Sequence, residues 1–119
     1  MQVGYWVGME PIGLLAQSTV SDLEAARSWY AAVLGRDADA NPMAGLLEWH
    51  FSDDAGVQLW RDPARAGSST MVVEVADLDD ELARLDKVGI AYDDPMSTPR
   101  VRLVTLEDPD RNRLILTGV

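Results

Sequence analysis

The stretch Val20-Ser21-Asp22-Leu23-Glu24 and the later stretch Val75-Ala76-Asp77-Leu78-Asp79 decide how this chain folds, because the second repeats the first. In each, an aspartate follows a strand-like segment and precedes a run of apolar residues at helical spacing. The two aspartates, Asp22 and Asp77, are 55 positions apart. A repeat of this length predicts two supersecondary modules that share one core.

Each repeat continues as an amphipathic helix that ends at a glycine. In the first, residues 21–24 fit a capping box, in which the Ser21 hydroxyl and the Glu24 carboxylate would satisfy the first helix amides. Gly35 supplies the left-handed residue that ends this helix. In the second, Asp77 is the expected N-cap and Gly89 the expected end.

Strand-like segments surround the helices, and loops with Gly, Pro or Asn separate them. The expected strands are residues 12–19, 46–51, 57–61, 70–76, 101–107 and 113–118, with loops at 36–45 and around Pro95–Pro99. The pattern predicts one α+β domain over residues 1–119, with module one at about 12–61, a linker at 62–69 and module two at about 70–118. Residues 1–11 stand outside both modules, and the sequence leaves open whether they pair as an edge strand, pack on a partner or fray.

The composition excludes several classes of protein. The net charge of −10 lacks the positive footprint of a nucleic-acid binder and disfavours an anionic membrane surface. No apolar run is long enough to span a membrane, and the N-terminus does not read as a signal peptide. Cys is absent, which excludes disulfides and thiolate metal sites. We expect a cytoplasmic protein whose acidity favours either solubility or a cationic small-molecule partner.

Several motifs together resemble the vicinal oxygen chelate superfamily, which includes glyoxalase I, extradiol dioxygenases and the fosfomycin- and bleomycin-resistance proteins. The resemblance covers about residues 12–118 and rests on Val20-Ser21-Asp22-Leu23, Trp29-Tyr30, Val33-Leu34-Gly35 and the turn Asp108-Pro109-Asp110-Arg111-Asn112. It implies paired βαβββ modules whose curled mixed sheets surround a cavity, with the helices outside. It also implies a homodimer, because many members are dimers with clefts across the subunit interface.

The resemblance also bears on a metal, since enzymatic members hold a divalent ion with His, Glu or Gln. The corresponding positions in this chain are Leu15, Gln58, Thr70 and Ile115. Two of these are aliphatic and threonine is a poor ligand, so we expect no metal cofactor at the usual place. A shift of two residues along the first strand of each module offers an alternative set for a divalent metal, consisting of Gln17, Gln58 and Glu74.

Strand alternation predicts which side chains face the cavity. In module one the helix should cover Leu47, Trp49, Phe51, Val57 and Leu59, and in module two Met71, Val73 and Val75. The opposite faces supply the predicted ligand-binding residues: Leu15, Gln17, Glu48, His50, Gln58, Trp60, Thr70, Glu74 and Ile115. This mixture of apolar walls with a few polar groups is typical of a small-molecule site.

Two of these residues have more than one interpretation. His50 is the sole histidine and shares a strand face with Glu48, so the pair is the candidate for acid–base catalysis; alternatively His50 is a solvated strand residue. Trp60 is the candidate for stacking on a planar or cationic ligand, or else an aromatic of a dimer interface.

Three hypotheses about function follow. The leading one is a small-molecule-binding protein similar in type to the bleomycin-resistance proteins, without the usual metal, that sequesters an aromatic or cationic compound. The alternative is a lyase, isomerase or dioxygenase-like enzyme that uses the shifted metal set or the His50–Glu48 pair. The third is a dimer that has the fold alone and serves as a regulatory or interaction module.

Overall fold

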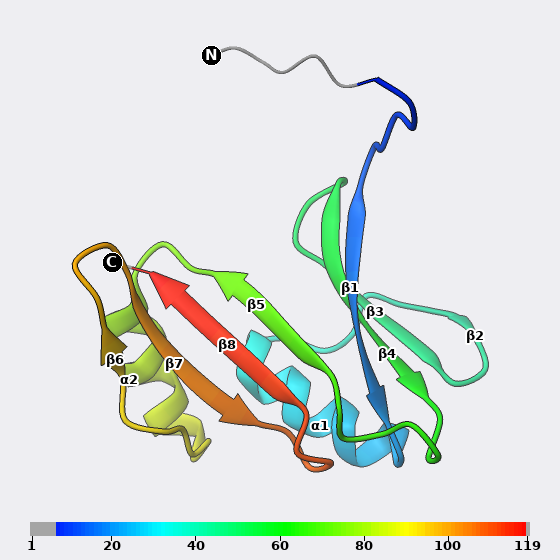
Figure 1. Cartoon of the computed structure of the whole chain (residues 1–119). Helices are drawn as coiled ribbons and strands as arrows, with labels where there is room; N and C mark the ends of the chain where they lie inside the picture. Colours follow the sequence, from blue (N-terminus) through cyan, green and yellow to red (C-terminus); the bar gives the residue numbers. More distant parts are fainter. Residues whose placement is uncertain (1–6, 119) are drawn as a thin grey trace.

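The computed structural model describes residues 7–118, which form two helices and eight strands (Figure 1). In chain order these are β1 (Leu14–Val20), α1 (Leu23–Leu34), β2 (Ala40–Met43), β3 (Leu46–His50), β4 (Ala55–Arg61), β5 (Thr70–Glu74), α2 (Leu78–Val88), β6 (Met96–Ser97), β7 (Arg102–Glu107) and β8 (Arg113–Gly118). Residues 7–13 form no strand and lead away from the body, whereas residues 1–6 lie outside the described part of the chain. No helix among the described residues is long and apolar enough to cross a membrane.

The strands form two mixed sheets of the same design. Sheet A has the order β1-β4-β3-β2 and sheet B the order β5-β8-β7-β6. In each, the first strand of the module pairs in parallel with the last, and the remaining neighbours pair antiparallel. The predicted α+β fold of two βαβββ modules is therefore confirmed.

The helix ends follow the sequence signals, with one exception. Asp22 and Asp77 accept hydrogen bonds from Ala25 N (3.1 Å) and Asp80 N (3.0 Å), and Gly35 and Gly89 end the helices with φ of 89° and 74°. The predicted capping box is wrong, because Asp22 and not Ser21 is the N-cap.

Ser21 instead binds the last turn of module two. Its hydroxyl donates to Asp110 Oδ1 (2.5 Å) and its amide to Asp110 Oδ2 (2.9 Å). A charged acceptor from a distant segment therefore takes the serine that local sequence assigns to the helix.

Strand pairing corrects the predicted loops. β2 lies within the expected loop 36–45, where Asn41 Nδ2 donates to Leu46 O (2.9 Å) and the edge position tolerates Pro42. β6 lies within the expected loop between Pro95 and Pro99, also at an edge. β3 ends at His50, so Phe51 is not under the helix as predicted but is 50% exposed.

The core lies between each sheet and its helix. Its buried apolar side chains come from α1 (Ala26, Tyr30, Val33), from α2 (Leu78, Leu82, Leu85), and from the covered sheet faces (Val20, Leu47, Trp49, Val57, Leu59, Met71, Val104, Leu106, Leu114, Leu116). Removing this apolar area from water is the main stabilising contribution.

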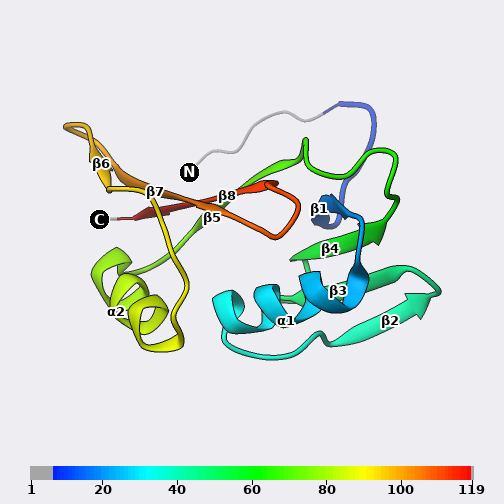
Figure 2. The same cartoon turned by 90° about the horizontal axis from the view of Figure 1, so that it is seen from below.

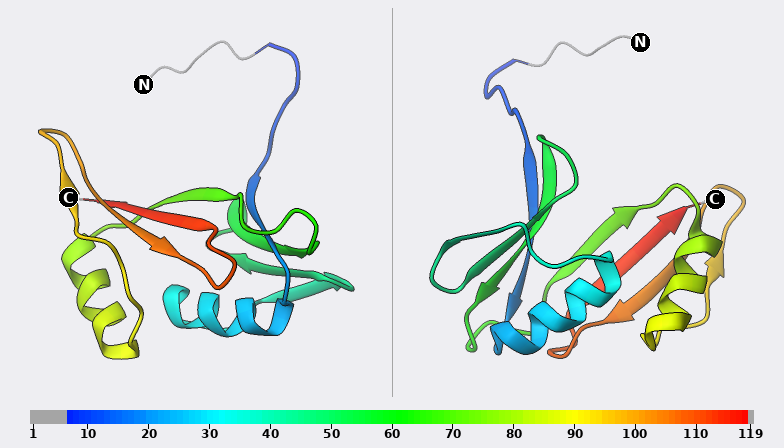
Figure 3. Two further views of the ribbon diagram at one scale, coloured as in Figure 1. Left: turned by 60° about the horizontal axis from the view of Figure 1, so that its bottom comes forward. Right: turned by 180° about the vertical axis from the view of Figure 1, so that it is seen from behind.

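The two helices also meet each other. The Arg84 guanidinium of α2 donates to the carbonyl oxygens of Ala32 (2.9 Å) and Val33 at the end of α1. Both helices lie inside the angle between the two sheets (Figures 2 and 3). The uncovered sheet faces, here called open face A and open face B, lie on the outside of that angle and do not face each other within one chain.

Candidate functional site

Open face A carries a continuous line of polar side chains across three strands. The register places Gln17 of β1 opposite Gln58 of β4, and Gln58 opposite Glu48 of β3. Gln17 Nε2 lies 3.0 Å from Gln58 Oε1, and Gln58 Nε2 lies 2.6 Å from Glu48 Oε2. His50 Nε2 lies 2.8 Å from Glu48 Oε1. These four residues, here called the polar ladder, are joined side chain to side chain because alternate residues of paired strands share one face.

Glu48 is the electrostatic centre of the polar ladder. The hydrogen bond with His50 and then the hydrogen bond from Gln58 hold the pKa of Glu48 below its ordinary value. The Glu48 side chain is 13% exposed, whereas that of His50 is 46% exposed. The ladder therefore presents an ionised, largely covered carboxylate beside an accessible imidazole.

Apolar and aromatic side chains flank the ladder on open face A. Leu15 lies opposite Gly56, and Gly56 lies opposite His50. Trp60 lies between Thr19 and Leu46 in the register and is half-buried. The six residues predicted from module one thus share one face of sheet A, and their strand positions follow from alternation alone.

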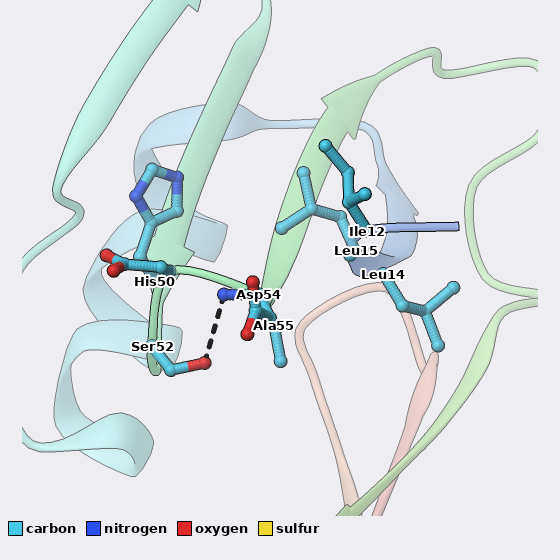
Figure 4. Close-up of a pocket in the computed structure, with 9 residues that line it drawn as sticks. Ile12, Leu14, Leu15, His50, Ser52, Asp54 and Ala55 are labelled. Carbon is cyan, nitrogen blue, oxygen red and sulfur yellow. Dashed lines mark hydrogen bonds between the residues drawn. The ribbon is translucent and has the colours of Figure 1, made fainter. Parts of the chain in front are cut away.

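A cavity lies at the His50 end of this face (Figure 4). Its volume is about 650 Å³, and it is lined by Ile12, Gly13, Leu14, Leu15, His50, Ser52, Asp53, Asp54 and Ala55. In Figure 4 the imidazole of His50 stands on one side and the side chains of Ile12, Leu14 and Leu15 on the other. Residues 52–54 were not among the predicted site residues, because an acidic turn is typical of a solvated loop.

The residues predicted from module two lie elsewhere. Thr70 and Ile115 are on open face B, opposite Arg113 and Val72 respectively. Glu74, at the end of β5, lines two smaller cavities of about 350 and 270 Å³ between the modules, together with Phe51 and Val73. One chain therefore keeps the predicted lining on two separate surfaces.

The residues at the predicted metal positions do not fit a divalent ion. Leu15 and Ile115 offer no donor atom, and the shifted set is not brought together, because Glu74 lines cavities that include neither Gln17 nor Gln58. Within residues 7–118 no group of three or more His, Cys, Asp or Glu side chains is placed to hold a metal ion.

Comparison with known proteins shows which solved structures this fold resembles. The sequence matches no family model and no curated protein, so the relationship is seen through solved structures. A glyoxalase/bleomycin resistance protein from Catenulispora acidiphila DSM 44928 superposes with a TM-score of 0.85 at 27% identity, covering 91% of this chain and 98% of the other. A glyoxalase/bleomycin resistance protein from Streptomyces sp. CB03234 is 31% identical, with a TM-score of 0.73 and coverage of 87% and 97%.

A third relative carries a more specific description. TnmS3, an antibiotic-binding protein from Streptomyces sp. CB03234, is 28% identical with a TM-score of 0.75, and the match covers 96% of this chain and 98% of that one. Taken with the two structures above, this likeness extends over nearly the whole chain. This chain belongs to the glyoxalase/bleomycin resistance family of the vicinal oxygen chelate superfamily.

Proposed function

We propose that this protein binds an organic small molecule on open face A and sequesters it without changing it chemically. The observation that carries the proposal is the polar ladder, which leaves hydrogen-bonding side chains on a sheet face that the chain's own helices do not cover. A binding protein needs only such a complementary surface, whereas an enzyme also needs groups aimed at a reacting atom. The description of TnmS3 as antibiotic-binding supports this class of function. The cytoplasmic location expected from the sequence stays a prediction.

The proposal includes a homodimer in which open face B of a second copy closes the cleft over open face A. Large apolar side chains on and beside these faces are exposed: Val72 to 60%, Leu14 to 77% and Leu15 to 40%. Patches of this kind commonly mark interfaces or ligand sites. A second copy would bring Thr70 and Ile115 to the cleft that contains Gln58 and Trp60, which reunites the lining predicted from the sequence.

Ligand screening tests the binding function directly. Aromatic and cationic compounds, including antibiotics, are titrated while tryptophan fluorescence is recorded, and Trp60→Phe is compared with Trp29→Phe, which alters a tryptophan of α1. We expect saturable quenching that Trp60→Phe removes and Trp29→Phe keeps. Mass spectrometry after incubation should return the compound unchanged. Absence of saturable binding, or conversion of the compound, would contradict sequestration.

Light scattering tests whether a second copy of the chain closes the cleft. Val72→Glu on open face B should shift the protein from dimer toward monomer and weaken binding, because a charge would enter the interface. Val88→Glu is the matched control, since Val88 is also exposed (49%) but lies at the end of α2. A wild-type monomer at binding concentrations would refute the dimeric cleft.

A second candidate function rests on the contact of 2.8 Å between His50 Nε2 and Glu48 Oε1. A carboxylate that orients an imidazole is a common arrangement for general acid–base catalysis. This candidate predicts turnover that disappears in His50→Gln while binding persists.

A further inference from the structure

The donor direction of the polar ladder points to a particular class of ligand for the site proposed above. We infer that the ladder selects a positively charged hydrogen-bond donor, an organic ammonium or amidinium group carried on an apolar body. The inference rests on the proposed function, because it names the ligand class of that same site.

The carboxylate of Glu48 fixes the direction of every hydrogen bond in the ladder, because an ionised carboxylate accepts and never donates. The Gln58 atom at 2.6 Å from Glu48 Oε2 must therefore be the amide nitrogen. Gln58 Oε1 then faces Gln17 and accepts from Gln17 Nε2 at 3.0 Å. At the other oxygen, His50 Nε2 must carry the proton that it donates at 2.8 Å. The amide orientations and the histidine tautomer follow from this one charge.

This direction leaves acceptors at both ends of the ladder. Gln17 Oε1 is an amide carbonyl at one end of the ladder, and at the other end Nδ1 is the acceptor in the His50 tautomer that carries its proton on Nε2. Neither atom accepts a hydrogen bond from the described part of the chain. A ligand can therefore donate to both ends of the ladder. The Gln17 amide also keeps a second N–H that could donate to a ligand, so the preference for a donor that is also a cation comes from the negative charge of Glu48 between the two ends.

The charged groups around His50 reinforce the same preference. Asp39 Oδ2 accepts from His50 N at 2.6 Å, and the turn that contains Asp53 and Asp54 lines the cavity beside the imidazole. Arg36 donates to His50 O, but its guanidinium is already paired with Asp39 at 2.8 Å. Among the described residues, four carboxylates (Glu48, Asp39, Asp53 and Asp54) and one guanidinium (Arg36) lie near His50, so the net charge around the imidazole is negative.

The apolar body has a place on either side of the ladder. Leu15 and Ile12 line the cavity of about 650 Å³ at the His50 end. Trp60 lies on the same face beyond Gln58, where its ring can meet a cation or a planar group. A cation with an apolar body thus matches both the hydrogen-bond acceptors of the polar ladder and the apolar side chains that flank it.

Three probes of one shape test the inference: naphthylmethylammonium, naphthylmethanol and naphthylacetate, each titrated calorimetrically into the full chain. We expect the ammonium to bind at least about tenfold more tightly than the carboxylate. Glu48→Gln should remove most of that selectivity, whereas Glu24→Gln, the same change on the exposed face of α1, should keep it.

A second variant keeps the test decisive if Glu48→Gln fails to fold. Gln17→Leu lies at an exposed position of the edge strand β1 and removes the terminal acceptor together with the hydrogen bond to Gln58 Oε1. Ammonium affinity should therefore fall while naphthylacetate affinity stays. Equal binding of ammonium and carboxylate, or selectivity that survives in both ladder variants, overturns the inference and leaves the binding function intact. If no probe binds, both this inference and the binding function fail.

Discussion

The phenol of Tyr30 in α1 donates a hydrogen bond of 2.8 Å to Asp108 Oδ2, although the two residues are 78 positions apart. Asp108 also accepts from Asn112 Nδ2 (2.9 Å), and Asn112 Nδ2 donates to Thr19 O (2.8 Å) at the end of β1. All three polar side chains are buried. The turn between β7 and β8 therefore connects the two modules through buried hydrogen bonds. This structural role explains why residues 108–112 identify the fold and carry no information about a ligand.

Replacing Tyr30 should weaken this hydrogen-bonded connection between the modules. Tyr30→Phe removes the hydroxyl that Asp108 and Ser18 contact. We expect the free energy of unfolding in urea to fall by about 1–3 kcal/mol, because the buried Asp108 carboxylate loses one of its hydrogen-bond donors. Tyr92→Phe is the matched control, since its hydroxyl bonds to Asp86 at the surface (2.8 Å) and its loss should matter less. Equal destabilisation by the two variants would show that the contact with Asp108 does not stabilise the fold.

The buried Tyr30 hydroxyl should also make the folded protein less stable at alkaline pH. Burial raises the pKa of Tyr30 far above its ordinary value. Above about pH 10 the unfolded chain loses this proton and the folded chain keeps it, so the free energy of unfolding should fall by about 1.4 kcal/mol per pH unit. Below that pH both states are protonated and the group contributes no slope. Urea titrations from about pH 9 to 11.5 should show a shallower decline in Tyr30→Phe than in Tyr92→Phe.

The sequence predicted local features well, because they depend on short-range spacing. Asp22, Asp77, Gly35 and Gly89 cap their helices, and strand period places Gln17, Glu48, His50 and Gln58 on one face. What it missed depends on segments that meet only in the folded chain. Ser21 turns to Asp110, 89 positions away, and Phe51 is exposed because β3 stops one residue earlier than expected.

The sequence also did not predict how the two helices meet, because that depends on contacts between distant segments, such as the one between Arg84 and the end of α1. That contact yields a third prediction. Arg84→Met keeps the aliphatic packing but leaves the carbonyls of Ala32 and Val33 without their donor, and should lower the free energy of unfolding by about 1–2 kcal/mol. Arg65→Met makes the same charge change at a side chain that is 84% exposed, and should have little effect. A similar loss in both variants would assign the effect to net charge.

Gly56 links the fold to the site and yields the last prediction. A Cβ at this position would lie 2.2 Å from Trp49 O and 3.1 Å from Leu15 Cδ2, so β4 could accept it only by moving away from β3 where His50 pairs with Gly56. Gly56→Ala should therefore lower the free energy of unfolding by about 1–3 kcal/mol or more and weaken ammonium binding as the His50 end of the ladder shifts. Gly8→Ala serves as control, because nothing lies within 4 Å of the added carbon and the backbone strain at its positive φ of 113° falls outside both sheets. Urea unfolding with calorimetric titration measures both effects. Unchanged stability and binding in Gly56→Ala would mean that the packing of β4 against β3 does not hold the ladder in place.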